Sequence, residues 1–158
     1  MQISPVTEAD LEQLEALYGQ LGATKTCIES MPAALQKNNS RGGPVVFVAR
    51  IDGKVVGTLL AATCQMLFGE CRSFMVVEDV VVDANYRRQG IGKALMRHVE
   101  QFARDRNCSY IMLITDTERV DSQAFYHALG YKSAEFSAFK KYLQHRSPLP
   151  GPAMPDSP

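Results

Sequence analysis

The feature that most constrains the fold is a sharp change of hydrophobic pattern in the middle of the chain. Residues 73–82, SFMVVEDVVV, are apolar at both alternating sets of positions, which predicts a central strand buried on both faces. A glycine-containing turn follows, and residues 95–106 then place apolar side chains at helical spacing. Residues 110–115, YIMLIT, predict a second buried strand. This order predicts two parallel strands joined by a crossover helix.

The rest of the chain predicts the remaining elements of one α/β domain with α+β character. We expect a mixed, mostly antiparallel central sheet of six to seven strands, flanked by about four helices. Pro32 lies inside the second helical pattern, so we expect it to interrupt that helix. The additional expected elements are strands at 2–5, 45–50 and 54–67, helices at 8–21, 24–37 and 121–129, and one or two closing strands within 131–143.

Chain length and proline content predict a single domain with a tail. The 158 residues fit one hydrophobic core, and we place the domain at residues 1–145. Residues 146–158, RSPLPGPAMPDSP, are so rich in proline that they exclude both a helix and a central strand. We therefore expect these residues to form an extended or disordered appendage.

Composition argues against several classes of partner. The chain carries 17 basic and 17 acidic side chains, so it lacks the basic excess of a nucleic-acid-binding protein. No apolar run reaches the length of a membrane span, and the first residues, MQISPVTEADLEQ, show no secretory signal. We therefore expect a cytoplasmic protein without nucleic-acid or membrane partners. The four cysteines form no C-x-x-C pair and the three histidines are scattered, so we expect no metal site.

The glycine-containing turn, NYRRQGIGKA, has the composition of an anion-binding site. A P-loop requires G-x-x-x-x-G-K-[ST], but Arg87 stands at the first glycine and Ala94 at the Ser/Thr that would hold magnesium. A dinucleotide fingerprint requires G-x-G-x-x-G, but Leu95 stands at the third glycine, after Gly90 and Gly92. The sequence therefore argues against both kinds of site.

The pattern that remains, R-x-x-G-x-G-K-A, suits a diphosphate bound without a metal. Its two glycines allow the backbone to approach a ligand closely, and the amides of residues 88–93 precede the first hydrogen bonds of the helix. These amides and the helix dipole favour an anion. The alternative is an ordinary glycine turn whose arginines face solvent. The basic side chains that raise the local potential are Arg87, Arg88, Lys93 and Arg97.

Two segments resemble the GNAT superfamily of N-acetyltransferases. EDVVVDANYRRQGIGKALM, residues 78–96, is similar to its acetyl-CoA-binding motif, whose signature is [QR]-x-x-G-x-[GA]. AFYHALGYK, residues 124–132, is similar to the downstream F-Y-x-x-x-G-[FY] segment. The order of the expected elements resembles the family over residues 2–143. This resemblance implies acetyl-CoA as the acetyl-donor cosubstrate and an amine as the acceptor.

The resemblance also implies which residues contact the cofactor. The strand before the turn is expected to pair its backbone with the pantetheine arm, and a backbone N–H near Val80 is expected to face the thioester carbonyl. The loop TDTERVDSQAFY lacks an asparagine that many members carry, so Ser122 is expected to replace that contact, while Arg119 could face the acceptor or solvent. The expected cofactor-binding residues are Val80, Val81, Val82, Arg87, Arg88, Gln89, Gly90, Ile91, Gly92, Lys93, Ala94, Ser122 and Phe125.

Three residues are candidates for the proton transfers of the reaction. Tyr126 matches the family tyrosine that protonates the leaving thiolate, and a phenol pKa of about 10 suits that transfer. Its alternative role is that of a core aromatic residue, like Phe125. Glu78 and Asp79 are charges in a central strand, which is costly unless they are used. One of them is expected to accept the proton of the acceptor amine; the alternative is a structural carboxylate, and the spacing does not choose between the two.

The resulting hypothesis is an acetyl-CoA-dependent N-acetyltransferase. It would transfer the acetyl group to a primary amine of a small molecule by direct attack in a ternary complex. Amino sugars, amino-sugar phosphates, polyamines and aminoglycosides are the candidate acceptors. One alternative is an enzyme that acetylates a peptide or a protein, and another is a regulatory domain that binds CoA without catalysis. Domains of this family often pair, so a homodimer stays open as the oligomeric state.

Overall fold

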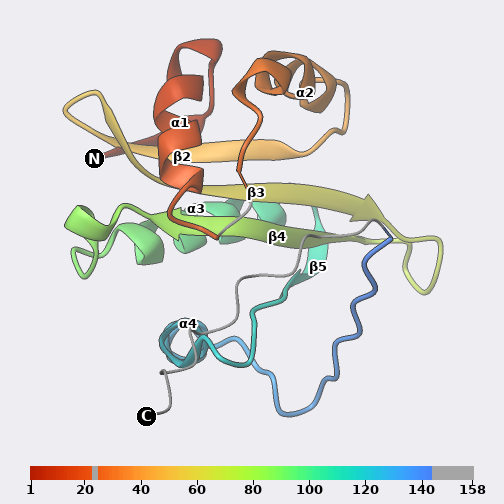
Figure 1. Cartoon of the computed structure of the whole chain (residues 1–158). Coiled ribbons are helices and arrows are strands. Elements are labelled where there is room, and N and C mark those ends of the chain that lie inside the picture. Colours follow the sequence, from red (N-terminus) through yellow and green to blue (C-terminus); the bar gives the residue numbers. More distant parts are fainter. Residues whose placement is uncertain (23–24, 144–158) are drawn as a thin grey trace, which may run out of the picture.

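One five-stranded sheet forms the centre of the molecule (Figure 1). The structure is a computed structural model that describes residues 1–22 and 25–143. Neighbouring strands are antiparallel except the last two, which are parallel. Along the sheet the strands follow their order in the chain: β1 (Gln2–Pro5), β2 (Val45–Ile51), β3 (Lys54–Gln65), β4 (Ser73–Val82) and β5 (Cys108–Leu113).

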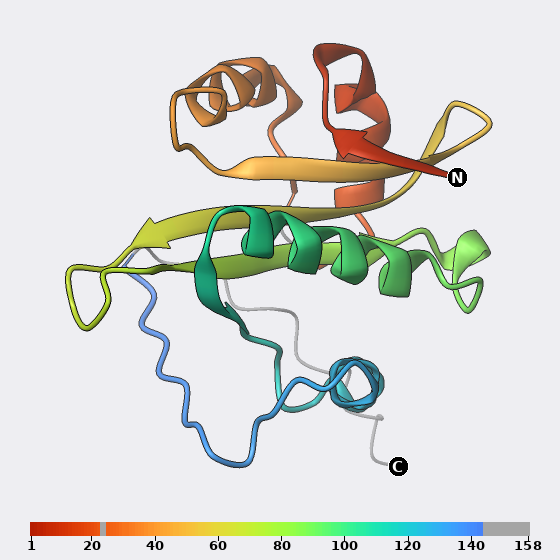
Figure 2. The ribbon, with the colours of Figure 1, turned by 180° about the vertical axis from the view of Figure 1, so that it is seen from behind.

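Helices cover both faces of the sheet. Helices α1 and α2 lie on one face, α3 lies on the opposite face between β4 and β5 in the chain, and α4 lies beyond the sheet on the α3 side (Figure 2). Within the described residues, no helix is long and apolar enough to cross a bilayer. The helices are α1 (Leu11–Tyr18), α2 (Met31–Asn38), α3 (Ile91–Asp105) and α4 (Val120–Ala128), with 3-10 turns η1 (Glu8–Asp10), η2 (Ile28–Ser30) and η3 (Ala84–Tyr86).

The sheet separates two hydrophobic clusters. On one side, Leu95 and Val99 of α3 are fully buried against Met75 of β4, as the helical spacing predicted. On the other side, Leu14 and Leu17 of α1 pack on the sheet. Burial of each such side chain stabilises the fold by about 2 kcal/mol. Because α3 and α1 are held on opposite faces, the strand between them is fixed on both sides.

Pro32 does not interrupt the second helix, so that prediction is wrong. The helix begins at Met31, and Pro32 lies in its first turn. Backbone N–H groups of the first turn have no partner within a helix, so a proline loses nothing there. The second helix is therefore shorter than residues 24–37 would allow, and a 3-10 turn precedes it.

The closing strands expected within residues 131–143 do not form, so the sheet has five described strands instead of six or seven. Phe136, Phe139 and Tyr142 are exposed and recur every three residues, a spacing that places no common apolar face on a strand. A turn also bends the chain, because the Phe136 N–H donates to the Ser133 carbonyl. The proline-rich tail at 146–158 lies outside the described residues.

A buried carboxylate ties the first strand to the second. The Asp10 carboxylate accepts hydrogen bonds from the Arg50 guanidinium and from both the N–H and the hydroxyl of Thr7. The same guanidinium donates to the Ser4 hydroxyl at 2.6 Å. Burial alone raises the pKa of Asp10, but the hydrogen bonds from Arg50 and Thr7 outweigh it and hold that pKa at about 2.

We expect Asp10→Asn to destabilise the fold in a pH-dependent way. A carboxyl whose folded pKa is depressed contributes stability above its unfolded pKa, and this contribution is lost as pH falls from about 4 to about 2. At pH 7 the free energy of unfolding, measured with urea, should be about 2 kcal/mol larger for the wild type than for the variant. This difference should shrink in acid. Glu8→Gln, an exposed neighbour, is the control. A gap that does not depend on pH contradicts the assignment.

Candidate active site

A β-bulge in β4 sets the geometry of the site. Asp79 has a positive φ of 54°, and the pairing of β4 with β3 gains one extra residue of β4 at this point. Before the bulge, Val77 packs in the α3-side cluster, whereas after it Val80 and Val82 join that cluster and Val81 faces α1. The bulge therefore shifts the alternation of the strand by one residue.

The pairing of strands β4 and β5 ends just before the bulge. Their parallel register ends with Val77 opposite Leu113, where β5 itself ends. Within residues 1–22 and 25–143, no strand lies beside residues 78–82 of β4 on the β5 edge. An unpaired strand edge next to a helix terminus can bind an extended ligand through its backbone.

The free edge presents two N–H groups at positions expected to bind the cofactor. Asp83 donates its N–H to the Val56 carbonyl of β3 at 2.9 Å. Backbone groups of a strand alternate between its two edges, so the N–H groups of Val82 and Val80 point to the opposite edge. The N–H near Val80, which the sequence singled out as a donor, therefore lies on the side left open by β5.

The predicted anion-binding turn has left-handed backbone at two positions. Arg88 has a φ of 62° and Gly90 a φ of 81°. The first hydrogen bond of α3 runs from the Ala94 N–H to the Gly90 carbonyl at 2.9 Å, so the amides of residues 91–93 precede that ladder. These amides lie at the positive end of a 15-residue helix, as an anion site requires.

The side chains around the turn divide into anchoring and exposed groups. The Arg87 Nε donates to the Val82 carbonyl at 3.2 Å and holds the turn against the end of β4. Ile91 is buried in the core, so it can offer a ligand its backbone rather than its side chain. The remaining polar side chains are exposed: Arg88, Gln89, Lys93 and Arg97. Of these, Gln89 donates its amide to the Asn85 carbonyl at 3.5 Å.

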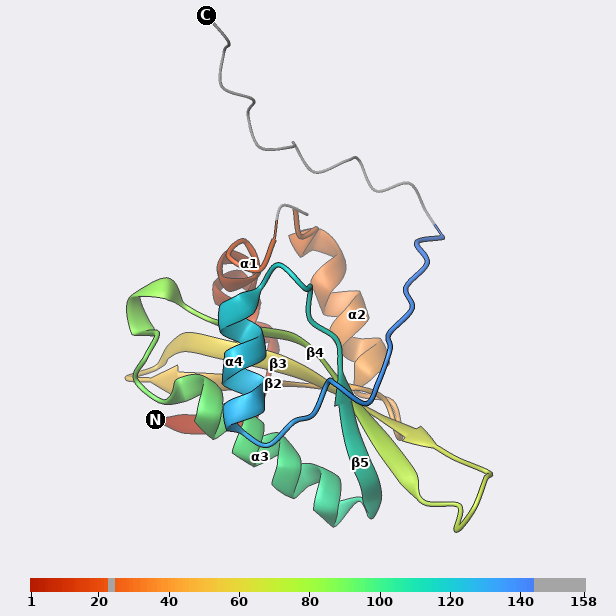
Figure 3. The ribbon, with the colours of Figure 1, turned by 90° about the horizontal axis from the view of Figure 1, so that it is seen from below.

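Gly92 joins the two sequence motifs in space. A Cβ placed on Gly92 would lie 3.2 Å from Cζ of Phe125 in α4 and 3.7 Å from Cγ2 of Val82 in β4. The absence of a side chain thus allows α4 to approach both the start of α3 and the end of β4 (Figure 3). Phe125, expected to contact the cofactor, lies at this junction.

Tyr126 follows Phe125 on α4 and faces the candidate base. Its ring centroid lies 5.1 Å from that of Phe125, and its side chain is half-buried. Burial raises the pKa of Tyr126, the positive charge of Arg119 lowers it, and the negative charge of Glu78 raises it. The phenol is therefore neutral at physiological pH and carries a proton to donate. Ser122 lies one helical turn before Tyr126 and is also half-buried.

The two carboxylates of β4 face different helices. Burial raises the pKa of Glu78 and of Asp79, and the charge of Asp79 raises that of Glu78 further. Glu78 acts electrostatically on Tyr126 of α4. Burial and the charge of Asp79 together raise the pKa of Tyr18, in α1, to about 12. Electrostatic interactions therefore connect Tyr126 to Glu78 and Glu78 to Asp79.

A sequence model described as "Acetyltransferase (GNAT) family" matches residues 10–131, which include the bulge, the turn and Phe125–Tyr126. The chain belongs to this family. The GNAT family implies acetyl-CoA as acetyl donor, and the open edge of β4, the unpaired amides at α3 and the basic side chains fit its pantetheine arm and diphosphate. Within residues 1–22 and 25–143, no three His, Cys, Asp or Glu side chains gather as metal ligands.

Similar proteins support the assignment to this family, and they differ in how much of each chain is aligned. Human N-acetyltransferase 8 is 38% identical over 101 residues, which cover 63% of this chain and 44% of that protein. Glucosamine 6-phosphate N-acetyltransferase of Trypanosoma brucei brucei is 28% identical over 137 residues, covering 85% and 91%. The crystal structure of glucosamine-6-phosphate N-acetyltransferase from Arabidopsis thaliana, 22% identical, superposes with a TM-score of 0.80 over 90% of this chain and 98% of that one, and shows the shared fold.

Sequence reasoning missed two groups that border the site and left a third open. The Arg119 Nη2 donates to the Leu21 carbonyl at 2.7 Å and joins the loop before α4 to the segment after α1. The sequence placed Arg119 in the right loop without a contact, because the two segments meet only in the fold. Tyr18 looked like part of an apolar helix, and Lys140, which lowers the pKa of Glu78 and Asp79, looked like part of a closing strand.

We expect Gly90→Val to weaken CoA binding at least tenfold. A β-branched residue is strained at the φ of 81°, so the turn would shift and its amides would lose their common direction. Gly69→Val is a matched control, because Gly69 has a φ of 62° and equally open surroundings in the loop between β3 and β4, at the opposite end of the sheet from the turn (Figure 1). Isothermal titration with CoA, beside thermal melting, measures both variants. Equal affinity of the two variants would refute the anion site.

Proposed function

We propose that the chain is an N-acetyltransferase that transfers the acetyl group of acetyl-CoA to a primary amine of a small molecule by direct attack in a ternary complex. The observation that carries this proposal is the contact of Gly92 with Phe125. This contact brings the anion-binding turn beside Tyr126, whose phenol is coupled electrostatically to Glu78. Membership of the acetyltransferase family supports the same reaction class.

The cofactor would be held by backbone more than by side chains. The amides at the start of α3, with Arg88 and Lys93 nearby, would bind the diphosphate, and the free edge of β4 would pair with the pantetheine arm. Phe125 and Ser122 would line the path between the two. When bound, acetyl-CoA supplies an acetyl group on a sulfur leaving group.

The residues at the bulge would carry out the proton transfers. Glu78 or Asp79 accepts the proton of the acceptor amine, and the raised pKa of both carboxyl groups suits that task. Tyr126 donates a proton to the departing sulfur. The N–H of Val80 donates to the carbonyl oxygen, and a donor of this kind is worth about 3 kcal/mol.

A tie between the loop before α4 and the segment after α1 favours a small molecule over a peptide as acceptor. The hydrogen bond from Arg119 to Leu21 joins the loop before α4 to the segment after α1, and such a tie would narrow the approach to the carboxylates. A small acceptor with a primary amine can enter such a site, whereas an extended peptide needs an uninterrupted channel. Two similar proteins are named for glucosamine 6-phosphate, which makes an amino-sugar phosphate the first acceptor to test.

Release of free thiol from acetyl-CoA tests the proposal. The protein is incubated with a panel of amino sugars, their phosphates, polyamines, aminoglycosides and lysine peptides. Turnover with at least one small amine, above turnover with the peptides, is the expected result. Turnover with the peptides alone would show that the acceptor is a peptide and not a small molecule. CoA binding without turnover on any acceptor would overturn the enzymatic assignment.

We expect Tyr126→Phe to lower kcat about 100-fold while CoA affinity stays unchanged. The change removes the proton donor and keeps the ring that packs on Phe125. Tyr131→Phe is the matched control, because the Tyr131 ring lies 6.1 Å from that of Tyr126 but its hydroxyl donates to Glu100 of α3. Both variants are measured where chemistry limits the rate. An unchanged kcat for Tyr126→Phe would exclude it as the acid.

We expect one of the variants Glu78→Gln and Asp79→Asn to remove the acid limb of the pH–rate profile. A base works deprotonated, and burial raises the pKa of both groups, so kcat/KM should rise with pH in the wild type. Without the base, kcat/KM should fall about 100-fold and lose this rise. Asparagine tolerates the positive φ at position 79, which preserves the bulge. If both variants keep the wild-type pH–rate profile, neither carboxylate is the base and their role is structural.

A further inference from the structure

Strands β4 and β5 carry four apolar side chains on the sheet face opposite α3. The neighbouring residues of both strands pack in the α3-side cluster: Met75, Val77, Ile111 and Leu113. Since successive side chains of a strand point to opposite faces, four others lie together on the other face, and we call them the apolar strip: Phe74, Val76, Tyr110 and Met112. Val76 pairs with Met112 across the two strands. The rings of Phe74 and Tyr110 stack with their centroids 5.2 Å apart.

The apolar strip lies outside both hydrophobic clusters. Helix α1 packs on β4 at Val81, at the opposite end of the strand from Phe74. Within residues 1–22 and 25–143, neither cluster includes a side chain of the strip, and Tyr110 and Met112 are 49% and 43% exposed. Contiguous apolar surface that a fold leaves exposed beside a candidate site marks a place where a ligand binds.

The strip leads to the candidate base Glu78. This residue follows Val76 by two positions and precedes the bulge, so its side chain lies on the same face as the strip. Its cross-strand partner is Leu60, which packs in the cluster on the α1 side and identifies the same face. Along β4, at about 3.3 Å per residue, Glu78 is about 7 Å from Val76 and about 13 Å from Phe74. The strip is therefore continuous with the site and has the length of a small molecule.

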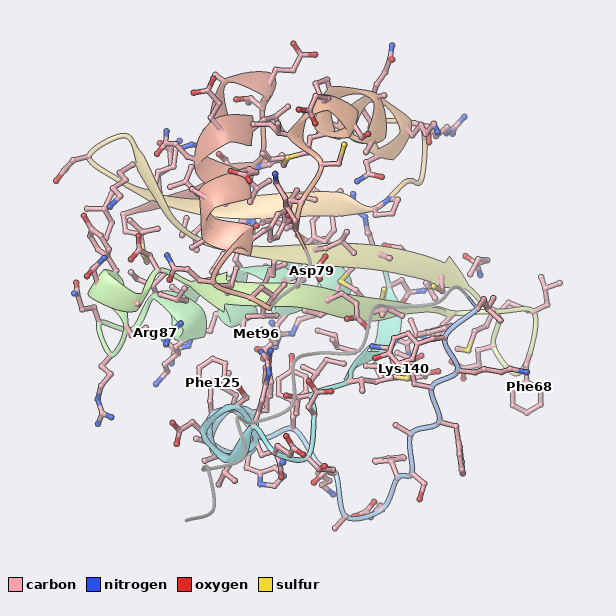
Figure 4. The ribbon with its side chains drawn as sticks, in the orientation of Figure 1. Phe68, Asp79, Arg87, Met96, Phe125 and Lys140 are labelled. Carbon is pink, nitrogen blue, oxygen red and sulfur yellow. The ribbon has the colours of Figure 1, made fainter. Side chains whose placement is uncertain are left out.

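One end of the strip is acidic and the other is apolar. Glu78 and Asp79 stand at the acidic end, where they outnumber Lys140, the lysine whose positive charge acts on both. Figure 4 shows Asp79 in β4 and Phe68 in the loop before that strand, and the strip lies between these two positions. No residue of the strip is basic, so a phosphate lying there would lose its water without gaining a partner. The surface is complementary to a molecule with an ammonium group at one end and an apolar body.

We propose that the apolar strip is the acceptor subsite of the enzyme and that it binds primary amines with an apolar body. The amine lies at Glu78, and the body lies on Val76 and Met112. The stacked rings of Phe74 and Tyr110 contact the far end of the body. This inference rests on the proposed function and adds the class of acceptor to it. Names of relatives make glucosamine 6-phosphate the first acceptor to try, and the strip makes apolar amines the better ones.

The chemical step is the one proposed for any amine acceptor at this site. The acceptor ammonium loses a proton to Glu78 or Asp79, and the neutral nitrogen forms an amide bond with the acetyl carbonyl carbon. The carbon–sulfur bond of the thioester breaks, and the sulfur takes a proton from Tyr126. The apolar body takes no part in this step. It holds the amine at the carboxylates and thereby lowers KM.

A series of n-alkylamines tests the subsite in the unaltered protein. The amines from n-propylamine to n-octylamine share one reacting group and differ only in apolar length. We expect kcat/KM to rise about threefold for each added methylene, because each buried CH2 group favours binding. Glucosamine 6-phosphate should have a lower kcat/KM than n-octylamine. A kcat/KM that does not depend on chain length overturns the inference.

Two substitutions test whether the strip is the surface that binds the apolar body. Met112→Thr and Tyr110→Thr remove apolar surface and keep a residue suited to a strand. Each should lower the ratio of kcat/KM for phenylbutylamine to kcat/KM for ethanolamine about tenfold. Leu67→Thr is the control, because it removes a 91% exposed apolar side chain from the loop between β3 and β4. Thermal melting shows that the variants fold, and equal ratios in all three overturn the placement.

Direct binding separates this inference from the proposed function. Calorimetric titration of the CoA-loaded protein with n-propylamine and n-octylamine measures affinity without transfer, and we expect the longer amine to bind more tightly. Transfer to amines without any effect of apolar length refutes the subsite alone. No transfer to any amine refutes the proposed function, and tighter binding of n-octylamine would still support the subsite. If Met112→Thr instead converts a dimer to a monomer in light scattering, a second copy of the chain occupies the strip and the inference is wrong.

Discussion

The bulge at Asp79 is the constraint on which the site depends. One extra residue of β4 enters its pairing with β3 just after the last pair with β5, Val77 with Leu113, and among the described residues the N–H groups of Val80 and Val82 have no strand partner on the β5 edge. The bulge also carries Asp79, next to Glu78, so the candidate bases lie beside the open edge that could bind a cofactor. Two helices on opposite faces keep that distortion in place.

The second requirement is a close approach of helices. Gly92 lets Phe125 reach the junction of β4 and α3, and Tyr126 then follows on the next position of α4. The anion-binding turn and the proton donor are thus linked by one contact between two motifs that lie more than 30 residues apart in sequence. A bound acetyl thioester would have its diphosphate at one end of this arrangement and its reacting carbonyl at the other.

The sequence predicted most of the helices and strands but not all of the contacts between them. Periodicity located β4, α3 and β5, and it predicted the buried face of α3 through Leu95 and Val99. It failed for residues 131–143, because strand propensity does not guarantee a neighbour with which to pair. It also failed at Pro32, because a proline in the first turn of a helix does not interrupt that helix.

The sequence by itself determined the chemistry that is local: glycines at fixed spacing before a helix, basic side chains around them, and a Phe-Tyr pair downstream. These features follow from the covalent order of residues within one or two turns. Only the tertiary structure decided which distant groups meet. The shift of register at Asp79 and the Arg119–Leu21 hydrogen bond depend on how whole elements pack, and short-range sequence patterns do not specify such packing.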